Sequence, residues 1–149
     1  MDIPNYSFDN TLLEGLQVID TFPVAAFLYE LPILIGAKKI LEIGIGSYGV
    51  STKIFLAVCK KTGGHLWSVD INPNCGKLFT DPNWTFICSP SQQIDCFDIF
   101  DVVLIDGDHN FDMVYTDLKK FVPLLRFNGY LYMHDTNEDG ILRAIDKYL

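Results

Sequence analysis

Acidic and histidine side chains stand at the points where apolar segments of this sequence end. The polar residues at these points are Glu42, Asp70, Ser89, Asp106, Asp108, His109, His134 and Asp135. Carboxylates accept hydrogen bonds from hydroxyl groups and bind hard divalent cations, and histidine exchanges protons near neutral pH. These residue types suit the binding of a polar ligand together with acid–base chemistry, provided that the fold gathers them in one place.

The segment 40–51 has the most informative spacing. It begins with an apolar run typical of a strand buried on both faces. Gly44, Gly46 and Gly49 then permit a tight turn and a close approach of the backbone to a ligand. A helix is expected to follow, with its first free N–H groups directed at that ligand. Because an unpaired buried carboxylate is costly, we expect Glu42 to have a partner or to reach water in a cleft.

The remaining elements alternate between strands and helices. Apolar runs predict further strands at 66–69, 84–88, 102–105 and 130–133. Helical periodicity predicts helices over 50–60, over 111–125 with Asn128-Gly129 as its stop signal, and over 140–148. Short connections between such elements predict an α/β fold, a parallel sheet with helices on both faces. Ligands of such sheets bind beyond the carboxyl ends of the strands, where the polar residues collect.

A single domain is predicted for residues 1–149, with an N-terminal helical segment at 1–36 and a core at 37–149. Helical spacing from Leu12 to Ile19 predicts one helix. A second helix is expected to begin at a Thr21 cap and to be disturbed or ended at Pro32.

Composition excludes several classes of function. The net charge is −8, with the acidic excess in the second half, which argues against a nucleic-acid partner. The N-terminus has no basic region typical of a signal peptide, and the apolar run 22–35 is too short for a membrane helix. The four cysteines form no CxxC pair, so we interpret them as reduced thiols of a cytoplasmic protein.

The spacing Gly44-x-Gly46-x-x-Gly49, followed by Asp70, predicts an adenosine-like ligand. The glycines have the spacing of a dinucleotide-binding turn, and an acid at the distance of Asp70 accepts two hydrogen bonds from a ribose diol. A turn that only packs a helix against a strand is the structural alternative. Glu42 distinguishes between two classes of ligand. Its carboxylate would repel a cofactor with a pyrophosphate and favour a sulfonium cofactor that carries an ammonium group.

Residues 41–49 match the acid-x-Gly-x-Gly-x-x-Gly signature of the S-adenosylmethionine-dependent methyltransferases, which this sequence resembles from about residue 20 to its end. The resemblance implies a three-layer Rossmann-like fold with S-adenosyl-L-methionine as cofactor. It implies that Glu42 lies near the methionine end and that Asp70 holds the ribose. The residues it assigns to the cofactor are Glu42, Gly44, Gly46, Gly49, Asp70, Ile71, Ser89 and Asp106.

The second half is similar to small-molecule O-methyltransferases of the catechol, caffeoyl-CoA and macrolide-sugar types. Many of these enzymes hold a divalent cation after the fourth and fifth strands, which implies Asp106 and Asp135 as ligands of Mg²⁺. His134 and Thr136 flank Asp135 where that subgroup has a further oxygen ligand. The predicted catalytic residues are Asp106, His109 and His134. A metal would lower the pKa of the acceptor's hydroxyl group, and without a metal a histidine could take the proton of that hydroxyl.

Two other functions remain open from the sequence: an NAD(P)-binding oxidoreductase, and a non-catalytic module that binds an adenosyl ligand. The acceptor is expected to be a small molecule that the residues do not name. Sheets of the family continue past the fifth strand with two more, whereas one predicted helix follows here. The fold is therefore expected to be C-terminally short, with a fifth strand that a homo-oligomer or another segment covers, unless the sequence is a truncated domain.

Overall fold

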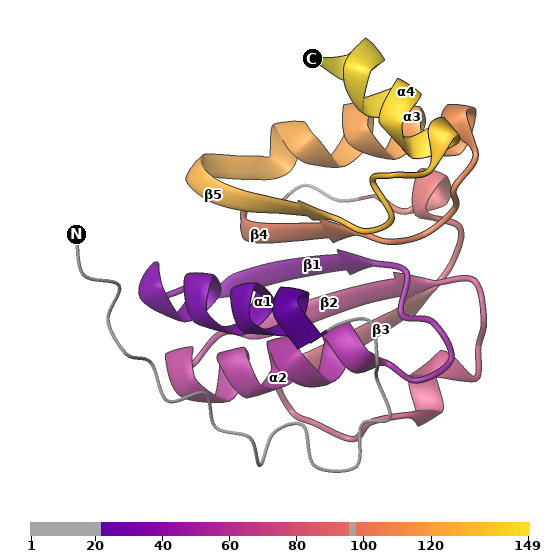
Figure 1. The fold of residues 1–149 in the computed structure, drawn as a ribbon. Helices are drawn as coiled ribbons and strands as arrows, with labels where there is room; N and C mark the ends of the chain where they lie inside the picture. The colour runs from indigo at the N-terminus through magenta and orange to yellow at the C-terminus, as the bar shows by residue number, and fades with distance from the viewer. Residues whose placement is uncertain (1–21, 96–97) are drawn as a thin grey trace.

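The computed structural model describes residues 22–95 and 98–149. Its centre is a five-stranded sheet in the order β3-β2-β1-β4-β5, and every pair of neighbouring strands is parallel. The strands are β1 (Lys39–Ile43), β2 (His65–Asp70), β3 (Trp84–Cys88), β4 (Phe100–Ile105) and β5 (Leu125–Met133). In Figure 1 their arrows point the same way, so all carboxyl ends lie at one edge of the sheet. The predicted parallel α/β fold is confirmed.

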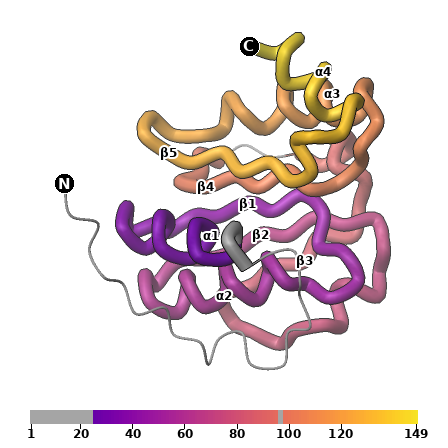
Figure 2. Tube along the Cα trace, in the orientation of Figure 1, coloured from indigo at the N-terminus to yellow at the C-terminus, as the bar shows by residue number. Residues whose placement is uncertain are grey.

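Helices cover both faces of the sheet. Figure 2 shows α1 and α2 together on one side and α3 and α4 together on the other. The helices are α1 (Phe22–Leu34), α2 (Val50–Thr62), α3 (Phe111–Phe121) and α4 (Asp139–Tyr148). Short 3₁₀ turns complete the chain: η2 (Cys75–Lys77), η3 (Ser91–Gln93) and η4 (Val122–Leu124). None of the helices in the described ranges is long and apolar enough to cross a lipid bilayer.

Alternation along β1 divides the core into two halves, because successive side chains of a strand point to opposite faces. Ile40 belongs to the cluster under α1 and α2. Leu41 and Ile43 belong to the cluster under α3 and α4. Glu42 shares the face of Ile40, so its carboxylate is directed beneath α2 and not into the apolar half under α3.

The strand order reverses between β1 and β4, and this is the place where open parallel sheets bind ligands. Beyond the strands, the pairing continues through the main chain. The Gly44 N–H donates to the Val69 carbonyl and the Asp106 N–H donates to the Ile43 carbonyl, both at 2.8 Å. These bonds fix the exits of β1, β2 and β4 side by side.

Several element boundaries differ from the sequence prediction. Strand β1 ends at Ile43, so Ile45 is buried in the turn instead of the strand. Helix α1 continues through Pro32 to Leu34, because a proline in the last turn removes only one helical donor. The predicted helix at 12–19 and the Thr21 cap lie outside the described residues.

The largest difference concerns Asn128-Gly129, which was expected to end a helix and instead lies inside β5. Helix α3 ends at Phe121, and η4, with Pro123 in its first turn, leads directly into the strand. Asn128 has φ 61, and the pairing register between β4 and β5 shifts at this place, as at a β-bulge. Strand β5 forms one edge of the sheet, and Phe127 on it is 91% exposed.

Candidate functional site

The glycine turn between β1 and α2 is built from three residues with positive φ. Gly44, Gly46 and Gly49 have φ values of 89, 68 and 57. A β-carbon at Gly44 would lie 2.0 Å from the main-chain oxygen of Asp106, whereas a β-carbon at Gly46 would meet nothing within 4 Å. Gly44 therefore permits two strand exits to touch, and Gly46 leaves open space above the turn.

Glu42 is fully buried, and its partners are hydroxyl groups. Ser51 donates to Oε1 at 2.5 Å, and Thr52 and Ser68 donate to Oε2 at 2.8 and 2.6 Å. Burial raises the pKa of Glu42 to about 7, although the three hydrogen bonds act in the opposite direction. The sequence predicted that Glu42 either has a partner or reaches water in a cleft. The structure shows hydrogen-bond partners and no contact of Glu42 with either hollow described below.

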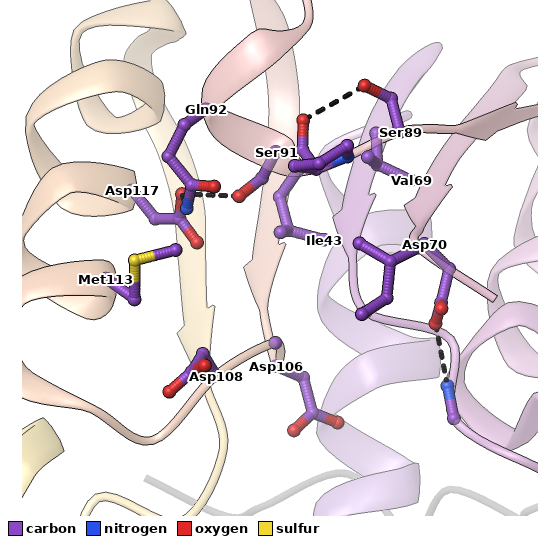
Figure 3. Close-up of a pocket in the computed structure, with 15 residues that line it drawn as sticks. Ile43, Val69, Asp70, Ser89, Ser91, Gln92, Asp106, Asp108, Met113 and Asp117 are labelled. Atoms are coloured by element: carbon purple, nitrogen blue, oxygen red, sulfur yellow. Dashed lines mark hydrogen bonds between the residues drawn. The ribbon is translucent and has the colours of Figure 1, made fainter.

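Asp70 joins the glycine turn to the exit of β2. Its Oδ2 accepts hydrogen bonds from the Ile45 and Gly46 N–H groups at 2.8 and 3.3 Å, and its Oδ1 accepts one from Asn72 N–H at 2.8 Å. The carboxylate thus holds two loops at the carboxyl edge, and it also lines the hollow between them. Figure 3 shows the bond to the turn as a dashed line.

A hollow of about 490 Å³ lies at this edge, over the exits of β1, β2 and β4. Its walls include the predicted cofactor residues Gly44, Gly46, Asp70, Ile71, Ser89 and Asp106. It also contains the carboxylates of Asp108 and Asp117, which Figure 3 shows on the side of α3. No lysine or arginine is among the described residues that line it. Cofactor-binding roles for these residues stay predictions, but the fold does bring them to one hollow.

The end of this hollow between η3 and α3 was not predicted as a site. Asp117 is 2% exposed, and its Oδ1 accepts hydrogen bonds from Ser91 Oγ at 2.7 Å and Gln92 Nε2 at 3.0 Å. Burial raises the pKa of Asp117, while these bonds and the charge of Lys120 lower it. The available signal was a polar residue at a buried position of the apolar stripe formed by Val114 and Leu118.

A second hollow of about 270 Å³ adjoins the first and shares Gly46 and Asp106 with it. It lies on the side of α1, between Leu28, Tyr48 and Tyr132, and its walls also include Gly49 and Ser51. The N-terminus of α2 opens into this hollow, and its first turn contains no acidic residue and no side-chain cap. Its amide groups can therefore bind an anionic ligand group. Glu42 lines neither hollow and lies beneath Ser51.

Asp106, His134 and Asp135 form a cluster at the exits of β4 and β5. His134 Nδ1 lies 2.9 Å from Asp135 Oδ2 and 3.5 Å from Asp106 Oδ1. The three residues offer ligand atoms within 4.8 Å of one another, as a metal site requires. Burial raises the pKa of Asp106, and the neighbouring histidines lower it. Asp135 has φ 49, and the N-cap of α4 is Glu138, so Asp135 does not cap that helix.

His109 belongs to the same cluster through Asp135. Its Nε2 lies 3.4 Å from Asp135 Oδ2, and its Nδ1 lies 2.9 Å from Glu138 Oε2. Glu138 was not among the predicted site residues, and its only signal was an acid three positions after Asp135. The three residues predicted as catalytic, Asp106, His109 and His134, thus lie in one connected group.

Among the described cysteines, Cys75 contacts the glycine turn, where its Sγ donates a hydrogen bond to the Gly46 carbonyl at 3.5 Å. Cys59 and Cys75 are buried free thiols and Cys88 is an exposed one, while Cys96 lies outside the described residues. Burial raises the pKa of Cys59 to about 12, which keeps this thiol protonated and unreactive.

Comparison with known proteins gives a family and a fold. A family model described as a methyltransferase domain matches residues 41–136, which is more than half of the chain. This match includes β1 from Leu41 onward, the glycine turn, the two residues that both hollows share, and the cluster of Asp106, His134 and Asp135. No curated protein sequence is significantly similar to this chain.

Three solved structures illustrate the likeness in fold. PaMTH1, an SAH-bound methyltransferase from Podospora anserina, is 17% identical with a TM-score of 0.65, over 84% of this chain and 66% of its own. A Staphylococcus aureus protein assigned to the caffeoyl-CoA O-methyltransferases is 15% identical with a TM-score of 0.68, over 95% of this chain and 80% of its own. MycE of mycinamycin biosynthesis, in complex with Mg and SAH, is 20% identical with a TM-score of 0.62, over 78% of this chain and 34% of its own.

The chain spans 66% of PaMTH1 and 34% of MycE, so the activities of those proteins are not transferred to it by likeness alone. The family match and the order of strands in the sheet nevertheless indicate the same fold. The chain belongs to the methyltransferase domain family and has the Rossmann-like fold of the S-adenosylmethionine-dependent methyltransferases.

Proposed function

We propose that this chain binds S-adenosyl-L-methionine and transfers its methyl group to an oxygen of a small molecule. The observation that carries the proposal is the charge of the larger hollow. Asp70, Asp106, Asp108 and Asp117 line it, and the described lining residues include no lysine or arginine. Such a hollow attracts a sulfonium and an ammonium group and repels a pyrophosphate, which disfavours the NAD(P) alternative.

The residues present fit the cofactor in shape as well as charge. Gly46 leaves open space over the turn, so a ligand can approach the backbone there. The larger hollow, with Asp70 in its wall, suits an adenosine group. The smaller hollow offers the N-terminus of α2 to a carboxylate and Asp106 to an ammonium group, which are the two charges of a methionine tail. The two hollows meet at Asp106, where the methyl group would then be presented.

Little covalent chemistry is required of the protein. The cofactor supplies a methyl group already activated by its sulfonium, so the chain has to align an acceptor oxygen with that carbon and exclude water. Leu28, Tyr48 and Tyr132 around the second hollow offer apolar and aromatic surface for an acceptor. The acceptor's proton would leave toward the cluster at the exits of β4 and β5.

We further propose that Asp106, His134 and Asp135 hold a divalent cation. Two carboxylates and an imidazole suit Mn²⁺ as well as the predicted Mg²⁺, because nitrogen ligands favour transition metals. A bound cation would lower the pKa of an acceptor hydroxyl. Without one, His109 or His134 would take the proton, because an imidazole can act as a base and both rings lie within 3.5 Å of carboxylates of the cluster.

Transfer of labelled methyl groups from S-adenosylmethionine to a panel of phenols, catechols and sugars, with and without Mg²⁺ or Mn²⁺, tests the proposal. We expect turnover of at least one hydroxylated acceptor and none of its methoxy analogue. Cofactor binding without turnover of any acceptor would favour the non-catalytic adenosyl-binding module instead. Tighter binding of NAD than of S-adenosylmethionine would overturn the proposal.

A cytoplasmic location and a homo-oligomer that covers β5 also belong to the proposal. Free thiols at Cys59, Cys75 and Cys88 are compatible with a reducing compartment. Strand β5 is an edge strand with Phe127 exposed, and such edges are commonly covered in folded proteins. Sedimentation velocity of the wild type and of Phe127→Lys would show whether β5 takes part in self-association.

A further inference from the structure

Asp117 is a carboxylate in an apolar position. It lies on α3 between Val114, Leu118 and Phe121, all buried against the sheet, and it is itself 2% exposed. A helix gains nothing in stability from an acid at such a position unless the acid is paired. In the proposed function Asp117 contributes only to the negative charge of the larger hollow, and the alignment of the acceptor with the methyl group gives it no specific contact.

Only one oxygen of this carboxylate is paired within the described part of the chain. Ser91 and Gln92 both donate to Oδ1, and no described residue donates a hydrogen bond to Oδ2. A β-carbon built on Gly107, another lining residue, would lie 4.0 Å from Oδ2, so this oxygen is on the side of the hollow. Figure 3 shows Asp117 directed into the hollow beside Gln92 and Met113. A buried acceptor oxygen is thus available to a ligand donor.

The surroundings hold this oxygen in a fixed place. Lys120, one turn further along α3, donates to the carbonyls of Ser91, Gln92 and Ile94 at 3.0, 2.9 and 2.5 Å. Helix α3 is therefore bonded to η3 in two ways. Lys120 binds main-chain carbonyls of η3, and Asp117 binds the side chains of Ser91 and Gln92. Such an arrangement prepares an acceptor before the ligand arrives, which is how binding sites gain specificity.

With the ribose at Asp70, the base of an adenosyl group extends into the part of the hollow bounded by Ile71, Met113 and Asp117. Ile71 and Met113 offer apolar surface to the faces of a planar ring, and Asp117 offers an acceptor to its edge. We infer that Asp117 is a specificity-determining residue, whose Oδ2 accepts a hydrogen bond from the 6-amino group of adenine. This inference rests on the proposed function. A 6-oxo purine presents lone pairs to the carboxylate at that position and is rejected.

Calorimetric titration of the wild-type protein with S-adenosylhomocysteine and with S-inosylhomocysteine, its 6-oxo analogue, tests the inference without any mutation. We expect the inosyl compound to bind at least tenfold more weakly. Asp117→Asn should bind S-adenosylhomocysteine about tenfold more weakly and discriminate between the two ligands less than threefold, because an amide offers both a donor and an acceptor. Asp112→Asn, an exposed acid in the first turn of α3, should keep the wild-type preference.

The outcomes separate this inference from the proposed function. A wild-type protein that binds neither compound contradicts the proposed function and the inference with it. A wild type that binds both equally well contradicts the inference alone. A folded Asp117→Asn variant, with a wild-type circular dichroism spectrum, that keeps the full preference shows that Asp117 only braces η3. If that variant does not fold, the comparison of the two ligands on the wild type decides.

Discussion

Gly44 and Asp106 lie so close that a β-carbon on the glycine would be 2.0 Å from the main-chain oxygen of the aspartate. This contact joins β1 to β4, the two strands between which the strand order reverses. It also fixes Asp106, whose carboxylate lines both hollows. The position of the proposed reaction therefore depends on a main-chain contact that only a glycine at position 44 permits.

Gly44→Ala is expected to lower the free energy of unfolding by about 2–5 kcal/mol, since it combines a strained positive φ with a main-chain clash. Gly46→Ala is the matched control, with φ 68 but no atom within 4 Å. It should cost about 1–2 kcal/mol, the strain alone, yet weaken S-adenosylhomocysteine binding because its methyl group enters the open space. Urea unfolding of both variants checks this, and equal losses of stability would contradict it.

Glu42 should make the stability of the metal-free protein depend on pH. Its folded pKa of about 7 lies above the ordinary 4.5, so its contribution is full below pH 4.5 and is lost as the pH rises through 7. Glu42→Gln cannot ionise and should escape this loss. From pH 5 to pH 8, the free energy of unfolding of the wild type should fall by about 2–3 kcal/mol relative to that of the variant. Parallel pH profiles in urea unfolding would show that Glu42 titrates normally.

Asp70→Ala should weaken S-adenosylhomocysteine binding by about 1–3 kcal/mol, because hydrogen bonds to a charged group are lost and the glycine turn is released. Asp81→Ala is a control of the same kind, since Asp81 accepts a main-chain N–H from Asn83 at 2.8 Å but lines neither hollow. Calorimetry on both variants makes the comparison. A control variant that binds as weakly as Asp70→Ala would mean that the effect reports only general loosening of loops.

Removal of a carboxylate from the cluster should weaken cation binding. Asp135→Asn is expected to bind Mn²⁺ at least tenfold more weakly than the wild type, because ligand charge sets the affinity of such sites. Asp139→Asn, an acid 84% exposed at its side chain and paired only with Arg143 among the described residues, should bind Mn²⁺ normally. Electron paramagnetic resonance of free Mn²⁺ measures both. Unchanged binding by Asp135→Asn would remove the cluster as a metal site.

The sequence was sufficient for features that depend on local pattern. The apolar run before Gly44 predicts a buried parallel strand, and the strand ends at Asp70, Asp106 and His134 follow from the same reasoning. Once the sheet is parallel, these ends must meet at one edge, so the approximate site follows from the order of elements alone.

Features that depend on distant partners were not predictable. Asn128-Gly129 has the composition of a turn, yet pairing with β4 accommodates it as an irregularity within β5, and the actual end of α3 is signalled by Pro123. The hydroxyl partners of Glu42 come from α2 and β2, and the pairing of Asp117 with η3 spans some 25 residues. No local pattern encodes such contacts.

Titration of the wild-type protein with S-adenosylhomocysteine, and separately with NAD, tests the central claim most directly, because it asks whether the hollow accepts an adenosyl ligand that carries an ammonium group or one that carries a pyrophosphate. The account predicts binding of one molecule of S-adenosylhomocysteine per chain and markedly weaker binding of NAD. Preferential binding of NAD, or failure of S-adenosylhomocysteine to bind the folded protein, would contradict it.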